Sequence, residues 1–456
     1  MSIKTIILAA GQGTRMKSAK PKILHKIADR CLLRHVYDMS KQLENNTVTV
    51  VYGHGADQVL QELEGLDVNW VEQKQQLGTG HAVQQTVGDI NDDDIVLILY
   101  GDVPLLKLST VQQLISQVDE QTLALLTVIL DDPTGYGRII RDSNQQVSKI
   151  VEEKDTTSNE KLVTEGNTGI LAVKGKPLKK WLSNLENSNA QEEYYLTDII
   201  EMAVNERFRI ATSHAGNVDE VLGVNNKNQL SHLERVFQLG KADQLMQDGV
   251  TLRDPARFDL RGEINALGTD IEIDINVILE GEVSIGNHVK IGANSIIKNA
   301  VIADNVEILP NTVIEDATIG ASSRIGPYAR IRPNTELGEK VNIGNFVEIK
   351  KTKVAEGSKI NHLSYIGDAQ IGSKVNVGAG TITCNYDGVN KFQTVIEDGV
   401  FVGSDTQLIA PVTVRKNATI GAGSTITKDA PEEQLTLSRP KQISVSTWQR
   451  PTKKEK

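Results

Sequence analysis

The sequence predicts two architectures in one chain: a doubly wound α/β domain over residues 1–228 and a parallel β-helix over residues 251–456, with a linking helix at residues 229–250. In the first half, apolar runs of strand length alternate with amphipathic segments, which is typical of a parallel sheet covered by helices. In the second half, an aliphatic residue recurs every six positions over more than twenty units. Six is a multiple of the strand period of two, so these residues point to one side of the chain, as in a β-helix. The alternative, an ordinary β-sandwich, would not keep this register for so long.

Composition narrows the class of protein. The net charge of −10 argues against a nucleic-acid-binding surface, so any phosphate ligand must be held by local positive charges. The two cysteines, Cys31 and Cys384, cannot form a disulfide framework, and the apolar start of the chain is too short for a signal peptide or a membrane span. We therefore expect a cytoplasmic protein with small-molecule partners, no nucleic acid and no membrane contact.

The α/β domain opens with a buried strand at residues 5–10, followed by a glycine-rich loop at residues 11–15. Such a loop lets backbone N–H groups approach a phosphate, and Arg15 and Lys22 add positive charge. A tight strand-to-helix turn with solvated basic side chains would explain the same residues. The loop alone leaves both interpretations open.

Strands and helices then alternate along the chain, at residues 33–43 (helix), 47–52 (strand), 57–64 (helix) and 68–71 (strand). Gln73 and a second glycine-rich turn at residues 77–82 come next, and this turn is expected to open a helix over residues 82–86. Two glycine-rich turns that leave the carboxyl ends of strands would flank the crevice where open α/β sheets bind ligands. A nucleotide fits such a crevice.

The strongest local signal in this half is the apolar run that ends at Asp102, with Pro104 stopping the strand beyond it. A carboxylate at the end of a central strand is a natural ligand for Mg²⁺, which prefers oxygen donors and often shares substrate phosphates. The alternative is an aspartate that caps a nearby helix. Further on, Gly137, Glu152 and Asn167 occupy loop positions without an obvious structural need, but the sequence alone does not show that they converge.

The order of these motifs resembles that of the sugar-1-phosphate nucleotidyltransferases. The resemblance rests on residues 8–16, Pro21, Lys22, Gln73, 78–80, 100–102, 135–137, Glu152, 167–169 and 223–226. Joined to the six-residue repeat, nearly the whole chain resembles the bacterial family of bifunctional N-acetylglucosamine-1-phosphate uridyltransferases and glucosamine-1-phosphate acetyltransferases. This resemblance implies a left-handed β-helix of hexapeptide repeats and a homotrimer formed through it.

The resemblance also implies a role for each motif residue in uridyl transfer. Arg15 and Lys22 would be the catalytic cations that neutralise the triphosphate of UTP and the leaving pyrophosphate, and Asp102 and Asn225 would ligate Mg²⁺. The rest of the UDP-sugar site would comprise Leu8, Ala9, Ala10, Gly11, Gln73, Gly78 and Thr79 at the uracil and ribose, Gly137, Glu152 and Asn167 at the amino sugar, and Tyr100 and Gly101 beside Asp102.

Between the two halves, residues 229–248 carry apolar positions on one side and charges on the other, and end at Gly249. We interpret this segment as a connecting helix. If it is instead the last helix of the first domain, the boundary moves by about twenty residues.

The spacing of the solenoid repeat aligns residues of successive coils. Its anchors are Leu267, Ile273, Leu279, Ile285, Ile291, Ile297, Ile302, Ile308, Ile314, Ile319, Ile325, Ile331, Leu337, Ile343, Ile349, Val354, Ile360, Ile366, Ile371, Val377, Ile396, Val402, Leu408, Val414, Ile420 and Ile426. The slot after an anchor is often glycine, which suits a tight corner. With three units per turn, the number that the resemblance supplies, three stacks follow: Arg332 with Lys350 and Gly367, Asn345 with His362 and Ala379, and Glu348 with Tyr365.

Arg332 and Lys350 replace glycine in two neighbouring coils, where two cations repel unless an anion lies between them. A sugar phosphate would serve. The alternative is a solvated corner in which Glu348 is the counter-ion.

Of the eight histidines, none shows metal-ligand spacing, and His362 is singled out by its place beside this basic column. Acetyl transfer to an amine needs a base to accept the amine proton, and His362 matches that base in the resembling family. The resemblance further implies that Arg332, Lys350, Tyr365, Asn376, Asn385 and Tyr386 bind glucosamine 1-phosphate, and that Ala379, Ser404, Ala422 and Arg439 bind acetyl-CoA. Along the chain His362 and Tyr365 are about 10 Å apart, so the insertion at residues 383–392 is expected to reach a neighbouring subunit.

The sequence thus predicts a bifunctional enzyme that acetylates glucosamine 1-phosphate and then transfers uridyl from UTP to N-acetylglucosamine 1-phosphate, releasing pyrophosphate. Two alternatives remain: a nucleotidyltransferase for another sugar 1-phosphate whose solenoid only oligomerises, and a nucleotide-sensing scaffold without activity. Arg15, Lys22, Asp102 and His362 count against the scaffold, and the Arg332/Lys350 column counts against a purely structural solenoid.

Overall fold

The computed structural model describes residues 2–451 and 453, and the chain divides into two compact units, residues 1–237 and 238–456. The division falls inside the helix α8 (Lys227–Gln247), which is the connecting helix predicted from the sequence. Within the described residues no helix is long and apolar enough to span a bilayer.

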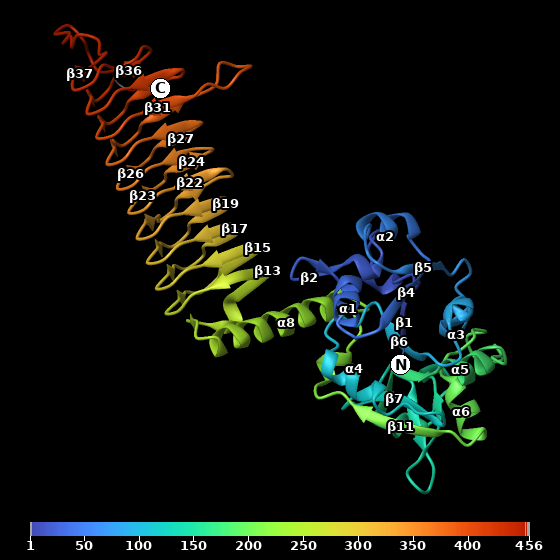
Figure 1. The fold of residues 1–456 in the computed structure, drawn as a ribbon. Helices are drawn as coiled ribbons and strands as arrows, with labels where there is room; N and C mark the ends of the chain where they lie inside the picture. Colours follow the sequence, from blue (N-terminus) through green and yellow to red (C-terminus); the bar gives the residue numbers. More distant parts are fainter. Residues whose placement is uncertain (1, 452, 454–456) are drawn as a thin grey trace. The chain divides into compact units, whose positions relative to one another are not determined.

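The first unit is built on a nine-stranded mixed sheet (Figure 1). Its strands are β1 (Ile3–Leu8), β4 (Asn46–Tyr52), β5 (Asn69–Glu72), β6 (Ile95–Tyr100), β7 (Thr122–Ile129), β8 (Arg138–Arg141), β9 (Val147–Val151), β10 (Glu165–Lys174) and β11 (Arg209–His214), and a separate hairpin comprises β2 (Lys26–Ile27) and β3 (Arg30–Cys31). The main order is β11-β7-β10-β6-β1-β4-β5, with β8 and β9 paired to each other beside β10. Strand β10 runs antiparallel to both of its neighbours β6 and β7, so the sheet is not wholly parallel.

Helices cover both faces of this sheet. They are α1 (Leu32–Ser40), α2 (Ala56–Glu62), α3 (Thr79–Gln84), α4 (Leu108–Ile115), α5 (Gly175–Leu182), α6 (Asp198–Asn205) and α7 (Val218–Val221), with short 3₁₀ turns at Thr14–Met16, Lys22–Leu24, Val87–Asp89, Glu153–Asp155 and Glu160–Leu162. Alternate residues of one strand enter different cores: Leu97 and Leu99 pack into one apolar cluster, and Val96 and Ile98 into the other. The apolar runs therefore belong to strands buried on both faces, as predicted.

Helix α3 begins three residues before its expected start. Gly78 adopts φ +107 and ends the turn, and Thr79 and Gly80 are already helical. A Cβ on Gly80 would lie 2.5 Å from Leu185 Cδ1 and 2.9 Å from the Tyr194 carbonyl oxygen. The second glycine of this motif is thus needed for close packing, which the sequence pattern does not reveal.

The register of β1 against β6 places the crevice. Strand β1 pairs with β4 on one side and with β6 on the other, and Leu8 lies opposite Tyr100. The chain proceeds from β1 to β4 and β5 in one direction and returns to the other side of β1 with β6, so the switch of strand order falls between β1 and β6. The loops after these two strands hold Gly11 and Asp102, and they flank the position where open α/β sheets bind ligands.

The second unit is a left-handed parallel β-helix whose strands stack as successive rungs (Figure 1). One column is β12 (Thr251–Leu252), β14 (Glu272–Ile273), β16 (Lys290–Ile291), β18 (Glu307–Ile308), β20 (Arg324–Ile325), β23 (Asn342–Asn345), β26 (Lys359–His362), β29 (Asn376–Val377), β32 (Phe401–Val402), β35 (Thr419–Ile420) and β37 (Leu435–Thr436). A second is β21 (Arg330–Ile331), β24 (Glu348–Lys350), β27 (Tyr365–Gly367), β30 (Ile382–Cys384), β33 (Gln407–Ile409) and β36 (Thr425–Ile426). A third is β22 (Thr335–Leu337), β25 (Lys353–Val354), β28 (Ala369–Ile371), β31 (Thr394–Ile396) and β34 (Val412–Val414). In the first coils, β13 (Phe258–Leu267), β15 (Val277–Ile285), β17 (Ile296–Ile302) and β19 (Val313–Ile319) are continuous through the second and third columns.

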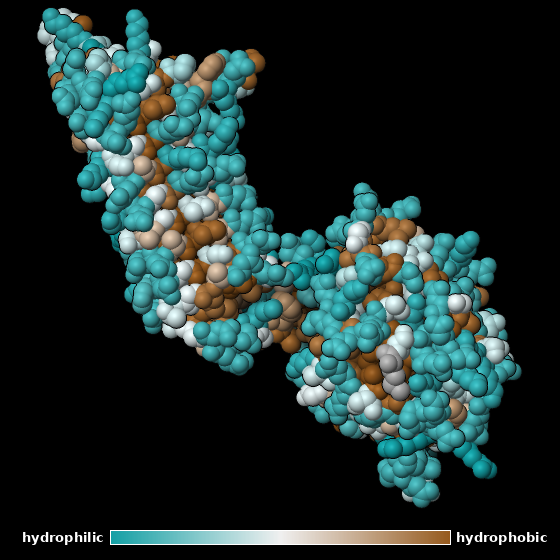
Figure 2. All heavy atoms as spheres, in the orientation of Figure 1, coloured by the Kyte–Doolittle hydropathy of each residue, from teal (hydrophilic) through white to brown (hydrophobic). Residues whose placement is uncertain are grey.

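The six-residue repeat is confirmed as the source of the core. Every anchor from Ile273 to Ile426 is at most 4% exposed, and Leu267 packs partly buried against the same cluster. Figure 2 shows a mostly hydrophilic solenoid surface with a stripe of apolar side chains on the face in view.

The expectation that the slot after an anchor holds glycine for a tight corner is wrong in most coils. Gly292 and Gly378 do not have positive φ; a Cβ on them would lie 2.7 Å from Pro310 N and 2.5 Å from Ser404 N of the next coil. The left-handed backbone conformation, with positive φ, is adopted instead by residues such as Asn294 and Asn311. At these two positions glycine is required because the next coil approaches too closely for a Cβ.

We expect the burial of an anchor to decide stability within one strand. Ile302 is 1% exposed and its neighbour Val301 is 49% exposed in β17. Ile302→Ala should lower the free energy of unfolding by about 2–5 kcal/mol, whereas Val301→Ala should change it by about 0.5 kcal/mol or less. Urea unfolding of the full chain, followed by far-UV circular dichroism, measures both. Equal losses would contradict the assignment of the anchors to the core.

Two candidate active sites

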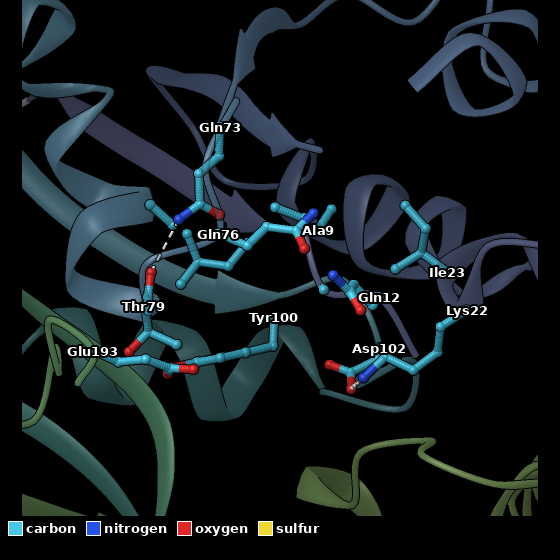
Figure 3. A pocket seen from close by; sticks show the side chains of 15 residues that line it. Ala9, Gln12, Lys22, Ile23, Gln73, Gln76, Thr79, Tyr100, Asp102 and Glu193 are labelled. Atoms are coloured by element: carbon cyan, nitrogen blue, oxygen red, sulfur yellow. Dashed lines mark hydrogen bonds and ion pairs between the residues drawn. The ribbon is translucent and has the colours of Figure 1, made fainter. Parts of the chain in front are cut away.

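The first candidate site is a cavity of about 480 Å³ at the switch point between β1 and β6 (Figure 3). Its lining includes ten of the predicted nucleotide-site residues, Leu8, Ala9, Ala10, Gly11, Lys22, Gln73, Gly78, Thr79, Tyr100 and Asp102. It also includes residues that were not predicted, namely Gln12, Ile23, Gln76, Ala82 and Glu193. Gln12 lies within the glycine loop and could have been inferred from it, but Glu193 comes from a distant loop with no recognisable motif.

Two polar ends of this cavity face each other in Figure 3. Lys22 and Asp102 lie together on one side, and Gln73 and Thr79 lie on the opposite side. The Gln73 amide donates to the Gly78 carbonyl at 3.0 Å, and the Thr79 hydroxyl accepts from the Leu196 N–H at 3.2 Å. The second glycine-rich turn is therefore fixed by hydrogen bonds before any ligand arrives.

A cluster of predicted charged and amide groups forms beside Asp102. The Lys22 ammonium donates to the Asp102 carboxylate and, at 3.2 Å, to Asn225 Oδ1. Arg15 donates to the same Asn225 oxygen at 3.0 Å. The Val224 N–H donates to the Asp102 carbonyl at 2.9 Å and fastens the segment that carries Asn225 to the end of β6. Four residues from three separate segments thus converge.

The contacts of this cluster bear on the alternative interpretations of Asp102, Arg15 and Lys22. The Asp102 carboxylate faces Lys22, and helix α4, which follows it, has no side-chain cap, so Asp102 is not a helix cap there. Lys22 and Arg15 are hydrogen-bonded to side chains from other segments, so they are more than solvated charges on a turn.

The donor set beside Asp102 fits Mg²⁺ with a shell completed by substrate. A carboxylate oxygen of Asp102 and the amide oxygen of Asn225 both accept from the single Lys22 nitrogen, so the two oxygens are aimed at one cationic position. Among the described residues no group of three or more acidic, histidine or cysteine side chains could form a metal cage. Mg²⁺ commonly takes one or two protein oxygens and fills its shell with phosphate oxygens and water.

Gly137, Glu152 and Asn167 also come together. The Asn167 N–H donates to the Gly137 carbonyl at 2.8 Å, and a Cβ on Gly137 would lie 3.5 Å from Glu152 Oε2. Thr197 donates to Glu152 Oε1 at 3.0 Å. Burial raises the pKa of Glu152, with Asp155 and Glu193 adding to the effect and Thr197 opposing it.

Tyr100 links this group to the cavity. Burial raises its pKa, and the negative charges of Glu152 and Asp102 add to the increase. The ring lies against Gly169, whose φ of +79 and missing Cβ leave room for it. Gly101 follows, with its N–H bonded to the Leu8 carbonyl at 2.9 Å, and this contact ties the β6 end to the β1 end.

In the solenoid, the columns predicted from the repeat are confirmed. Strand pairing places Asn345 against His362, Glu348 against Tyr365 and Lys350 against Gly367. The Arg332 N–H donates to the Ile349 carbonyl at 2.8 Å, which puts Arg332 one coil below Lys350. The side chain of His362 contacts Asn345 Oδ1 through Nδ1 at 3.0 Å.

The expectation of two unneutralised cations at Arg332 and Lys350 needs correction. Arg332 is paired with Glu348 at 2.7 Å, as in the alternative interpretation of this corner, because both side chains project from the same column. Lys350 faces Lys391 instead, and this neighbour is the main cause that lowers the pKa of Lys350, with desolvation and Arg332 contributing and Asp368 opposing. The repelling pair is therefore Lys350 and Lys391. Lys391 was missed because it belongs to the insertion that interrupts the repeat.

The insertion is anchored beside this lysine pair. Asn385 donates to Asp368 Oδ2 at 2.6 Å, and Tyr386 forms an isolated bridge with Lys391. A Cβ on Gly367 would lie 2.5 Å from the Tyr365 hydroxyl and 3.0 Å from Asn385 Nδ2. Tyr365 and Asn385 are thus brought together above Gly367, on the column of Lys350.

The predicted acetyl-CoA residues follow a different column, the one that contains His362. The Gly380 N–H donates to the His362 carbonyl, the Asp405 N–H to the Ala379 carbonyl at 2.7 Å and the Gly423 N–H to the Ser404 carbonyl at 2.8 Å. Ala422 therefore continues the same corner, and Arg439 reaches it, since a Cβ on Gly423 would lie 3.7 Å from Arg439 Cδ. Asn376 stacks between Lys359 and Phe401 on the first column.

Comparison with known proteins agrees with both halves. The MobA-like NTP transferase domain matches residues 5–147, the GMPPB C-terminal domain matches residues 265–343, and the bacterial transferase hexapeptide (six repeats) matches residues 393–428. Fold and site together define a transferase in which a nucleotidyltransferase unit precedes a hexapeptide-repeat β-helix.

Relatives that match over the full length identify the family. Proteins described as "Bifunctional protein GlmU" are 60% identical in Methylococcus capsulatus, over 100% of this chain and 99% of the relative, and 56% identical in Marinobacter nauticus, over 99% of both. One from Azoarcus sp. is 54% identical over 99% of this chain and 100% of its own length. The chain belongs to the bifunctional GlmU family, which confirms the resemblance found in the sequence. It is a transferase that combines uridyl transfer and acetyl transfer in UDP-N-acetylglucosamine synthesis.

The acidic surroundings of Glu152 lead to a prediction for stability. Burial raises the pKa of Asp198 from 3.8 to about 6, assisted by Glu152, Glu201 and Asp155. Because the folded chain binds this proton more tightly than the unfolded chain, stability falls as the pH rises from about 4 to about 6, and the loss persists at higher pH. Asp198→Asn should therefore raise the free energy of unfolding at pH 8 by about 1–3 kcal/mol.

The same variant should gain only about a third as much at pH 4.5, where Asp198 is largely protonated in the folded chain. Urea unfolding at the two pH values measures both gains. A gain in stability that is independent of pH, or a loss of stability at pH 8, would show that the charge of Asp198 does not destabilise the folded chain.

Proposed function

We propose that uridyl transfer takes place in the cavity between the β1 and β6 loops, with Arg15 and Lys22 as its catalytic cations. The observation that carries this assignment is the convergence of Arg15, Lys22, Asp102 and Asn225 beside the cavity. The phosphate oxygen of N-acetylglucosamine 1-phosphate attacks the α-phosphorus of UTP, and pyrophosphate leaves. Phosphoryl-group transfer of this kind depends on positioning and on charge stabilisation rather than on a side-chain nucleophile.

Mg²⁺ would be held by Asp102 and Asn225 and would neutralise charge on the phosphates. The roles of the other residues are those that the family resemblance implies, and the lining of the cavity supports them at the nucleotide end. The β1 loop backbone from Leu8 to Gly11 and the fixed turn of Gly78 and Thr79 hold the nucleotide. Gly137, Glu152 and Asn167 hold the amino sugar, with Tyr100 between them and Asp102.

For acetyl transfer, the amine nitrogen of glucosamine 1-phosphate attacks the thioester carbonyl of acetyl-CoA, and the CoA thiolate leaves. His362 accepts the proton that the amine loses. Asn345 orients the imidazole through Nδ1, which leaves Nε2 to receive the proton. Lys350 and Lys391 supply the positive charge for the phosphate of glucosamine 1-phosphate, and Arg332 and Tyr365 flank it. Ala379, Ser404, Ala422 and Arg439 line the path for acetyl-CoA along the His362 column.

The two acetyltransferase columns lie on either side of a corner that contains Leu363 and Ser364. Leu363 is exposed there, and so are Tyr328 and Phe346 at the equivalent corner positions of the two preceding coils. We propose a cytoplasmic homotrimer in which a neighbouring solenoid covers this corner, so that each pocket is completed by two chains. The uncovered apolar corner and the hexapeptide-repeat architecture support this assembly.

A solenoid that only oligomerises is not favoured, because it has no need to hold Lys350 against Lys391. These lysines gain nothing from their mutual contact and are explained by an anionic ligand.

Separate sites make the two activities separable by mutation. Asp102→Ala should lower the rate of pyrophosphate release from UTP and N-acetylglucosamine 1-phosphate by about 100-fold or more, with acetyl transfer unchanged. His362→Ala should lower thiol release from acetyl-CoA by about 100- to 10,000-fold and leave pyrophosphate release intact. Each variant is the folding control of the other, and loss of both activities in either one would refute two independent sites.

Lys391 is expected to bind substrate although it lies outside the repeat. Lys391→Ala should raise the KM for glucosamine 1-phosphate by about 10-fold with the KM for acetyl-CoA unchanged. Lys353→Ala is the matched control, since Lys353 is a solenoid lysine paired with Glu336 at 2.9 Å. Thiol-release kinetics at pH 7.5 distinguish the two variants, and equal KM values for the sugar phosphate would remove Lys391 from the site.

A further inference from the structure

Gly137 and Glu152, two residues of the proposed amino-sugar site, flank the open end of one hairpin. Strands β8 and β9 pair antiparallel, with Arg138 opposite Val151. Gly137 precedes Arg138 and Glu152 follows Val151, so the two residues are the first ones beyond the last pair of the ladder. The ladder positions Arg138 and Val151, so the separation of Gly137 and Glu152 depends on this pairing and on the contacts that hold the two chain ends together beyond it.

An ion pair holds the two chain ends together beyond the paired region. Arg138 is only 2% exposed, and its Nη1 donates to the Tyr136 carbonyl and lies 2.8 Å from Glu153 Oε2. Glu153 Oε2 also accepts from the Gly135 N–H at 3.3 Å. One guanidinium and one carboxylate thus connect the loop before Gly137 to the residue after Glu152.

The arrangement also determines which of two adjacent carboxylates faces the sugar. Glu153 is occupied by Arg138 and the Gly135 N–H, whereas Glu152 accepts from Thr197 through Oε1 and directs Oε2 toward Gly137. A buried guanidinium without a counter-ion is strongly unfavourable, so Arg138 holds Glu153 in this orientation.

The segment beyond Glu153 is secured as well. Lys154 donates to Gln191 at 2.6 Å, and Asp155 accepts from the Ala190 N–H at 3.2 Å and from the Tyr195 hydroxyl at 3.3 Å. These contacts fix the chain after Glu152 on one side only. The connection across to Gly137 comes from Arg138 and Glu153.

We propose that Arg138 and Glu153 are positioning residues that set the distance between Gly137 and Glu152 and thereby the affinity of uridyl transfer for its amino-sugar substrate. The inference rests on the proposed function, which places that sugar at Gly137, Glu152 and Asn167. Neither Arg138 nor Glu153 contacts the sugar in this scheme.

Steady-state kinetics on the full chain test the proposal. Glu153→Gln should raise the KM for N-acetylglucosamine 1-phosphate by about 5- to 20-fold, with the KM for UTP and the rate of acetyl transfer within about two-fold of the parent chain. Arg138→Lys, which keeps the charge but loses the forked donor, should act in the same way. If Arg138→Lys does not fold, Glu153→Gln alone still decides the question, because Glu153 is partly exposed.

Glu165→Gln is the matched control. Arg141, three residues along β8 from Arg138, is paired with Glu165 through contacts of 2.7 and 2.8 Å. This variant breaks a comparable ion pair of the same strand without touching the Gly135 to Gly137 loop. It should leave the KM for the sugar phosphate within about two-fold, even if the melting temperature falls.

Glu152→Ala and the double variant Glu152→Ala/Glu153→Gln separate positioning from general loosening. If Glu153 acts through Glu152, the double variant should have the same KM as Glu152→Ala alone. Additive increases, or an equal increase in Glu165→Gln, would overturn the proposal.

The set also distinguishes failure of the inference from failure of the proposed function. A raised KM in Glu152→Ala with an unchanged KM in Glu153→Gln would overturn only the positioning role. An unchanged KM in Glu152→Ala would remove the sugar from this end of the cavity and overturn both.

Discussion

The register of paired strands is the constraint on which both sites depend. In the first unit, Leu8 lies opposite Tyr100, so the loops that follow carry Gly11 and Asp102 to the same edge of the sheet. In the solenoid, Ile349 lies opposite Ile366, so the residues around them are stacked about 4.8 Å apart. Residues distant in sequence become neighbours because their strands share a register, and no special contact between them is required.

The sequence predicted the positions of residues best where a repeat period or the end of a strand determines them. The anchors follow from counting residues along the repeat, and the Asn345/His362 stack follows once the family resemblance supplies three units per turn. The end of an apolar run indicated Asp102, whereas Asn225 beside it came from the resemblance alone. The position of Lys391 could not be predicted in this way, because the insertion that contains it has no repeat period. Arg332 was placed on the correct column, but its ion pair with Glu348 depends on side-chain geometry, which the repeat does not give. Most glycines of the repeat were explained by the wrong property, since coil-to-coil distance is invisible in the sequence.

In the two proposed sites, a few cations of this acidic protein share their partners or lie beside one another. Lys22 and Arg15 share the oxygens of Asp102 and Asn225, and Lys350 is left beside another lysine. Elsewhere on the solenoid, lysines such as Lys353 and Lys340 are paired with glutamates of the adjoining coil. The cations proposed to bind phosphate are thus distinguished by their local surroundings and not by the overall charge of −10.

The close approach of coils at the glycine slot has a consequence for how such a chain can evolve. Pairing advances from Ile331 to Ile349 and from Ile349 to Ile366, steps of 18 and 17 residues. A duplicated or deleted coil meets the same backbone surface on each side and needs no new packing solution. A single side chain at Gly292 or Gly378 has no such tolerance. Length can therefore change by whole turns without new packing, whereas added residues within a coil must leave the stack, as the insertion at residues 383–392 does.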